Sequence, residues 1–151
     1  ESGTPEKQLI LELTESCKES DPNGLRDDFE YFKNMGINMA LDDFGTEYSS
    51  IALLRKLKPQ WIKIDHTFVR SIQDDEMDQA ILEYIMNLSK QTRIKVCVEG
   101  VENKEILSVV QTYKPELLQG YYYSKPCPAE EFSKKYFNGK DKTGSYGCLK
   151  K

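Results

Sequence analysis

The chain has 151 residues, which fits one domain, and 38% of them are hydrophobic, enough to build a sizeable core. Charged residues make up 30% and the formal net charge is −4; this indicates a folded globular protein and disfavours binding to duplex nucleic acid, which needs a basic surface. No apolar run is long enough to span a membrane, and four separated cysteines without a CxxC pair indicate reduced thiols in a cytoplasmic setting.

Short apolar runs alternate with longer segments of helical spacing. Runs typical of strands cover residues 9–13, 37–41, 61–64, 95–98 and 117–123. Helical patterns follow each of them, at residues 25–35, 51–57, 77–88, 106–113 and 130–137. Five strand-helix units in strict alternation predict a parallel α/β architecture. The Gly/Lys/Ser-rich segment after residue 138 predicts a tail.

Polar side chains recur where the predicted strands end. Asp42 and Asp43 follow the second apolar run and precede Phe44 and Gly45. Two adjacent carboxylates repel each other unless a cation or hydrogen-bond donors offset their charge. On its own this pair is most simply a solvated acidic turn. The other polar residues at or inside the strands are Glu12, Glu15, Lys63, Asp65, Glu99, Glu102 and Gln119. Such repetition is typical of the active face of a (β/α) barrel.

Glu12 and Lys63 each lie inside an apolar run. A glutamate inside a barrel is costly unless it binds a cation. Lys63 is flanked by Ile62 and Ile64, and in a barrel mouth it would be held by carboxylates and would orient a water. The alternative is that Lys63 faces solvent at the barrel rim.

Five motifs occur in a fixed order along residues 9–126: Glu12-Leu13-Thr14-Glu15, Asp42-Asp43-Phe44-Gly45-Thr46, Lys63-Ile64-Asp65, Glu99-Gly100-Val101-Glu102 and Gln119-Gly120-Tyr121. This series resembles the EAL domain, a family of bacterial cytoplasmic phosphodiesterases that hydrolyse cyclic di-GMP to linear pGpG. The resemblance implies a partial (β/α)8 TIM-type barrel, with about five units that correspond to strands four to eight of the family barrel. A further reading, an unrelated barrel metalloenzyme, would need a different set of acids at the strand ends.

The resemblance also implies roles for individual residues. Glu12 and Asp42 correspond to ligands of one metal; Asp42 would bridge to a second metal, with Asp43 as its further ligand. Glu99 corresponds to a general base or metal contact beside the attacking water, which Lys63 would position. The remaining matches are loop-stabilising or substrate-lining: Glu15, Glu102, Asp65 and Gln119. An oxygen-rich set of this kind suits Mg²⁺ or Mn²⁺.

The chain departs from the family pattern in its extent. It begins with Glu1 rather than Met and lacks the first three strands with their share of the metal ligands. We therefore expect an incomplete two-metal site, and two open sheet edges that need partners. The expected parts are an N-terminal remnant at residues 1–7, a partial barrel at 8–138 and a tail at 139–151. The parent would add upstream EAL strands and a sensory or GGDEF-type domain, and family members often form homodimers.

A second departure is Glu47, which stands where the family loop has glycine. A glutamate would be strained there if the position needs a positive φ. Two functions therefore remain open. The chain is part of a cyclic di-GMP phosphodiesterase that is weak by itself, or it is a degenerate EAL module that binds cyclic di-GMP or a protein without turnover. His66, the single histidine, is expected to face solvent.

Overall fold

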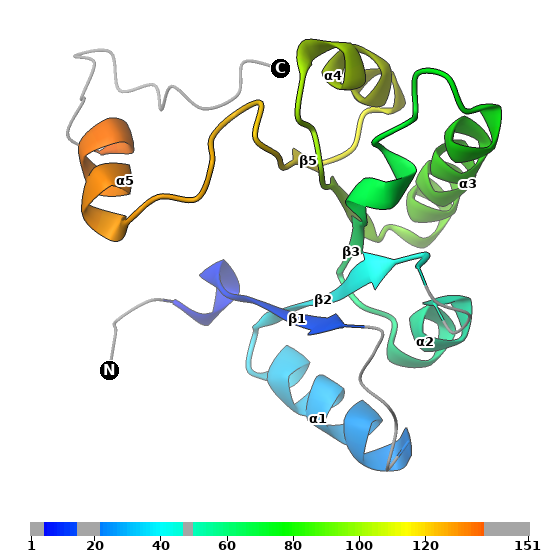
Figure 1. Ribbon diagram of the computed structural model, residues 1–151. Coiled ribbons are helices and arrows are strands. Elements are labelled where there is room, and N and C mark those ends of the chain that lie inside the picture. Colours follow the sequence, from blue (N-terminus) through cyan, green and yellow to red (C-terminus); the bar gives the residue numbers. More distant parts are fainter. Residues whose placement is uncertain (1–4, 15–21, 47–49, 138–151) are drawn as a thin grey trace.

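Strands and helices alternate along the chain in a computed structural model that describes residues 5–14, 22–46 and 50–137 (Figure 1). The strands are β1 (Ile10–Thr14), β2 (Asn38–Phe44), β3 (Trp61–Ile64), β4 (Lys95–Val98) and β5 (Leu117–Leu118). The α-helices are α1 (Pro22–Asn34), α2 (Ser50–Leu57), α3 (Glu76–Thr92), α4 (Lys104–Val110) and α5 (Ala129–Tyr136). Short 3-10 helices are η1 (Glu6–Gln8), η2 (His66–Phe68) and η3 (Gln111–Tyr113). The predicted alternation is confirmed.

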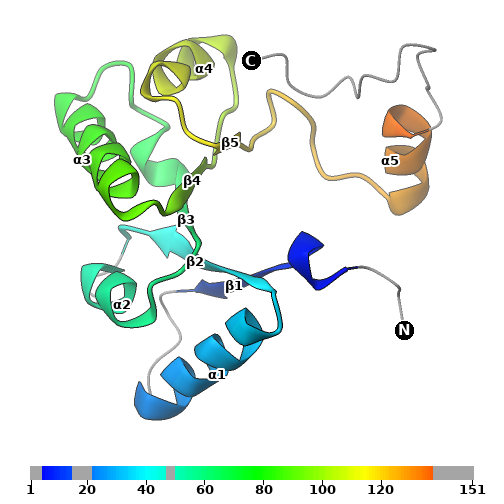
Figure 2. The same ribbon diagram turned by 180° about the vertical axis from the view of Figure 1, so that it is seen from behind.

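The five strands form one parallel sheet in the order β1-β2-β3-β4-β5. Each strand pairs with the next one in sequence after a helical crossover, which is the arrangement of a (β/α) barrel. Helices α1 to α4 follow the curve of the sheet on one side, whereas α5 lies apart on the other side (Figures 1 and 2). Within the described residues, no helix has the length and apolarity needed to cross a membrane.

The core lies between the sheet and helices α1 to α4. Alternate strand residues point to opposite faces of a sheet, and one set here is almost completely buried: Leu41, Ile62, Ile64, Val96 and Val98. Helices contribute equally buried side chains, among them Leu57, Leu82 and Val110. Because these apolar residues account for one face of β2, β3 and β4, the other face of these strands is left to carry the polar side chains.

Strand β2 is longer than the sequence predicted, and Asp42 and Asp43 lie inside it. The register of β2 against β3 shifts between Leu41 and Phe44, and Asp43 has a left-handed backbone with φ 53°. An extra residue in one strand of this kind is a β-bulge, a feature that redirects side chains near functional sites. Aspartate tolerates the left-handed region better than most residues.

Strand β5 is shorter than the predicted run at residues 117–123, and that prediction is wrong beyond Leu118. Gln119 still donates its backbone N–H to Val98 O at 2.9 Å. The chain then turns, because Tyr122 N–H bonds back to Val101 O at 2.9 Å. The turn brings Gly120 so close to Val101 that a Cβ on Gly120 would overlap the backbone of Val101.

Both edges of the sheet are open within the described residues, as the sequence predicted. Strand β1 is the more apolar edge, with Leu9, Ile10 and Leu11 exposed by 40%, 41% and 37%. An exposed apolar edge is a template for pairing with another strand. The five-stranded sheet could therefore pair with a further strand along β1.

We predict that Gly120→Ala destabilises the fold. The new methyl group would clash with backbone atoms of Val101, which cannot rotate away, and overpacking of this kind costs about 1–3 kcal/mol. Urea denaturation should therefore show a lower midpoint. Gly36→Ala is a useful comparison, because an added Cβ there meets no atom within 4 Å and only the backbone with φ +86° is strained. A midpoint of Gly120→Ala equal to that of the unmodified chain would contradict the close approach.

Candidate metal centre and active site

The site is centred on Lys63, in the middle strand β3. Its side chain is 10% exposed, and its Nζ lies 2.8 Å from Glu12 Oε2, 2.9 Å from Asp42 Oδ1 and 2.9 Å from Glu99 Oε1. Burial by itself would lower the pKa of Lys63, but the contacts with these three carboxylates raise it above its ordinary value. The alternative that Lys63 faces solvent is wrong.

Strand register explains why these three acids meet one ammonium. Thr14 pairs with Asp42 across β1 and β2, and Glu12 is two residues before Thr14, so Glu12 and Asp42 share a face. Lys63 pairs with Cys97 across β3 and β4. Glu99, two residues after Cys97, shares that face and lies just beyond β4.

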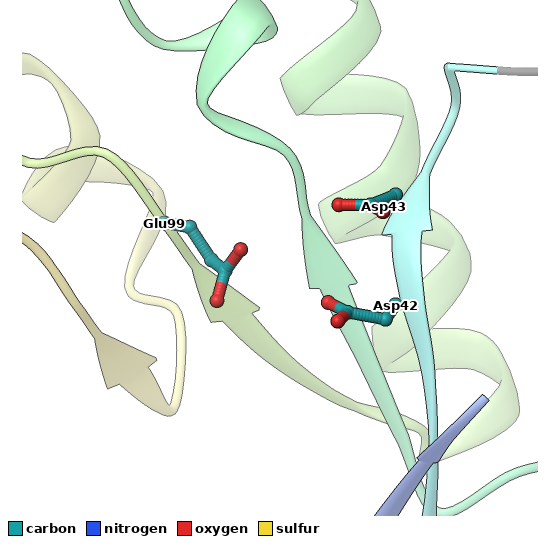
Figure 3. Close-up of side chains that lie close together, drawn as sticks. All are labelled: Asp42, Asp43 and Glu99. Atoms are coloured by element: carbon teal, nitrogen blue, oxygen red, sulfur yellow. The ribbon is translucent and has the colours of Figure 1, made fainter. Parts of the chain in front are cut away.

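Asp42, Asp43 and Glu99 form an acidic cluster in which one oxygen from each lies within 4.8 Å of the others. Figure 3 shows the two aspartates on β2 and Glu99 beyond β4, with β3 between them. Two successive strand residues normally point to opposite faces. The bulge at Asp43 is what allows both carboxylates of the pair to reach the same cluster.

The donor set fits a hard divalent cation. Asp42 Oδ1 is buried and accepts no hydrogen bond within the described chain; although Lys63 Nζ lies 2.9 Å away, its direction gives charge attraction rather than a hydrogen bond. Four carboxylates, those of Glu12, Asp42, Asp43 and Glu99, face a single ammonium here, so negative charge is in excess. Carboxylate oxygens in this number are the ligands that Mg²⁺ and Mn²⁺ prefer.

Two carboxyl groups of the cluster are harder to ionise than usual. Burial, with the neighbouring charges of Asp42 and Asp65, raises the pKa of Asp43 above its ordinary value. Burial is also the main cause that raises the pKa of Glu99; the contact with Lys63 offsets part of this rise, and the charges of Asp42 and Glu12 add smaller contributions to it. In both groups burial disfavours the charged form of the carboxyl group.

The remaining predicted residues lie around this cluster in different ways. Asp65 is buried and caps η2, since its Oδ1 accepts Thr67 N–H at 2.9 Å and its Oδ2 lies 2.9 Å from His66 Nδ1. These contacts lower the pKa of Asp65 against the effect of burial. His66 is largely exposed, as expected. Glu102 and Gln119 are exposed on the loops after β4 and β5. Glu15 and Glu47 lie outside the described residues.

Cys97 is a buried neighbour of the site that the sequence indicated only as part of an apolar strand. It pairs with Lys63 in register and so shares its face of the sheet. Burial, together with the charge of Glu99, raises the pKa of the Cys97 thiol to about 12. A thiol in this state is a poor nucleophile and metal ligand, so Cys97 packs beneath the charged groups.

Comparisons with known proteins agree with this geometry. A family model described as EAL domain matches residues 1–126. The cyclic di-GMP phosphodiesterase NbdA of Pseudomonas aeruginosa is 34% identical over 131 residues, which cover 85% of this chain and 17% of the relative. The cyclic di-GMP phosphodiesterase PdeF of Escherichia coli is 35% identical over 121 residues, which cover 80% of this chain and 16% of the relative.

Solved structures show the same similarity. The EAL domain of Mycobacterium smegmatis DcpA superposes with a TM-score of 0.83 at 30% identity, covering 88% of this chain and 60% of that one. Klebsiella pneumoniae BlrP1, solved as a manganese and cyclic di-GMP complex, gives a TM-score of 0.78 at 32% identity, covering 83% of this chain and 32% of that one. This chain spans less than a fifth of the length of NbdA and PdeF. By the family match over most of its length, it belongs to the EAL domain family.

Proposed function

We propose that this chain supplies part of the active site of a phosphodiesterase that hydrolyses cyclic di-GMP to linear pGpG in its full-length parent. The observation that supports this most directly is Lys63, held by three carboxylates beside the Asp42, Asp43 and Glu99 cluster. The named activity of NbdA and PdeF supports the choice of substrate. A bacterial cytoplasmic location is part of the same proposal.

Divalent ions, Mg²⁺ or Mn²⁺, are the cofactors in this proposal. Asp42, Asp43 and Glu99 would hold one, and Glu12 would add a ligand from β1 toward a two-metal site. When bound, such ions supply positive charge to the phosphodiester and make water a better nucleophile. The BlrP1 structure, described as containing manganese with cyclic di-GMP, supports Mn²⁺ as a competent ion in a relative.

The protein groups divide the remaining work. Lys63 holds Glu12, Asp42 and Glu99 in fixed positions through ion pairs, and its positive charge would orient water beside them. Glu99 would accept the proton of the attacking water, because its raised pKa brings it closer to the operating pH at which a general base is effective. Asp65 positions η2 at the rim of the site through its cap. Glu15, Glu102 and Gln119 retain their proposed roles in loop support and substrate contact.

The rest of the barrel would come from partners of this segment. Strand β1 is an apolar edge that upstream EAL strands would cover, and those strands would complete the metal shell. A sensory or GGDEF-type domain and a homodimer belong to the proposed parent; MucR of Pseudomonas aeruginosa, a relative with 35% identity, is named as a bifunctional diguanylate cyclase and phosphodiesterase. We expect the 151-residue chain alone to turn over cyclic di-GMP very poorly.

Metal binding gives the first test. We predict that the chain binds Mn²⁺ weakly, without full occupancy of two sites, and that Asp43→Asn lowers the affinity at least about tenfold through loss of one ligand charge. Asparagine also tolerates the left-handed backbone of residue 43. The substitution therefore removes the charge without adding backbone strain. Isothermal titration calorimetry measures the affinity, with Asp27→Asn on the exposed face of α1 as the matched control. Tight occupancy of two sites would contradict the incomplete shell.

The same titration has a predicted pH dependence. The pKa values of Asp43 and Glu99 are raised, so protons compete with the metal for these groups at a higher pH than for ordinary carboxylates. Protonation weakens binding, and the affinity for Mn²⁺ should therefore begin to fall at a higher pH than it would for ligands with ordinary carboxyl pKa values. In Asp43→Asn this loss should be smaller. An affinity that falls only where ordinary carboxyl groups titrate would contradict the assigned ligands.

Catalysis gives the second test. In the full-length parent, Lys63→Met should lower kcat for formation of pGpG by about 10²–10⁴-fold, because the water and the three carboxylates lose the positive charge that they share. Chromatographic separation of cyclic di-GMP and pGpG measures the rate, and Lys104→Met at an exposed position of α4 should leave it unchanged. Thermal melting checks that the variant is folded. A parent that binds cyclic di-GMP tightly but produces no pGpG would instead support the binding-module function.

A further inference from the structure

A cleft of about 660 Å³ opens at the end of the sheet opposite to the acidic centre. Its floor includes Asn38, Gln60 and Lys95, which lie at the amino ends of β2, β3 and β4, and its sides come from α2 and α3. Glu99 is four residues after Lys95, a span of about 13 Å at the usual strand rise. The cleft is therefore separate from the candidate metal centre.

The walls of the cleft are largely apolar. Leu54 from α2 is buried, whereas Leu88 and Ile94 are partly covered. Tyr84 of α3 also lines the cleft and is 58% exposed, so its ring is available to a ligand. Small-molecule sites are concave and mostly apolar with a few polar groups, and the cleft has both the shape and the volume of such a site.

The charged side chains that line the cleft are all positive. Arg55, Lys58, Arg93 and Lys95 line it, and none of its described lining residues is acidic. These four side chains make no ion pair with any described residue. Lys95 instead stacks over the ring of Trp61, with its Nζ 5.0 Å from the ring centroid. In a chain of net charge −4, this is a local concentration of cations around an apolar wall.

Two of the cations stand at positions that usually favour glycine. Lys58, just after α2, has φ 48°, and Arg93, the C-cap of α3, has φ 61°. Left-handed backbone at helix ends favours glycine, which has no Cβ. The helix dipole stabilises a cation at the carboxyl end of a helix, which accounts for Lys58 and Arg93. It does not account for Arg55 in α2 and Lys95 in β4, which line the same apolar cleft.

We propose that this cleft binds a small organic anion with a flat apolar body, of the class of aromatic phosphates, sulfonates and carboxylates. The apolar wall and the Tyr84 ring would cover the body of the ligand. Arg55 and Arg93 would bind the anionic group, since guanidinium groups pair with such oxyanions through two parallel hydrogen bonds. The site goes beyond the phosphodiesterase function and does not depend on it.

The probe for this proposal is 1-anilinonaphthalene-8-sulfonate, an aromatic sulfonate whose fluorescence reports binding. The 151-residue chain is titrated in EDTA, which prevents metal at the acidic centre from recruiting the anion. We expect saturable binding that weakens at least about tenfold in Arg55→Glu and in Arg93→Glu, as expected for reversal of one charge in contact with an anion. Arg93→Lys, which keeps the charge, should retain most of the affinity.

Arg70→Glu is the matched control, because Arg70 is an exposed arginine near η2 that does not line the cleft. Its affinity should equal that of the unmodified chain. The proposal is overturned if both cleft variants bind the probe normally, or if Arg70→Glu loses as much affinity as they do. Sedimentation velocity tests a second copy as occupant: a dimer that disappears in the cleft variants, with unchanged probe binding, also overturns it.

Discussion

The contact of one buried ammonium with carboxylates from three other segments organises the carboxyl end of this sheet. Lys63 on β3 contacts Glu12 on β1, Asp42 on β2 and Glu99 after β4, each within 2.9 Å. Removing one partner of a buried ion pair is costly, because it leaves the others uncompensated. The contact therefore ties four successive units of the arc together at the place where chemistry is proposed. It also leaves negative charge in excess, which a divalent cation would neutralise.

A second constraint is the bulge in β2. In a regular strand, Asp42 and Asp43 would point to opposite faces, and one of them would enter the core between sheet and helices. The register shift after Leu41 and the left-handed backbone of Asp43 bring both to one cluster with Glu99. Aspartate tolerates the left-handed conformation of residue 43 better than most residues. Backbone strain of this kind is common at functional sites. Burial, with a smaller contribution from neighbouring carboxylates, raises the pKa values of Asp43 and Glu99.

The two ends of the sheet have opposite electrostatic character. The carboxyl end gathers acids around Lys63, whereas the amino end carries Arg55, Lys58, Arg93 and Lys95 around an apolar cleft. A parallel sheet places all strand starts at one end and all strand ends at the other. Residues before the strands therefore gather at one end of the sheet, and residues after the strands gather at the opposite end. For this reason the proposed anion site and the candidate metal site lie at opposite ends of the same sheet.

The sequence by itself determined the alternation of strands and helices, the parallel class and the acids at the strand ends, because apolar periodicity and the position of polar residues are local properties of the chain. Motif order also identified the family. The tertiary structure decided the rest. Whether Lys63 was buried or exposed, and how Asp43 reaches the side of Asp42, depended on register between strands. The early end of β5 depended on contact between Gly120 and Val101. The basic cleft arose from residues of α2, α3 and β4 that no linear motif connects.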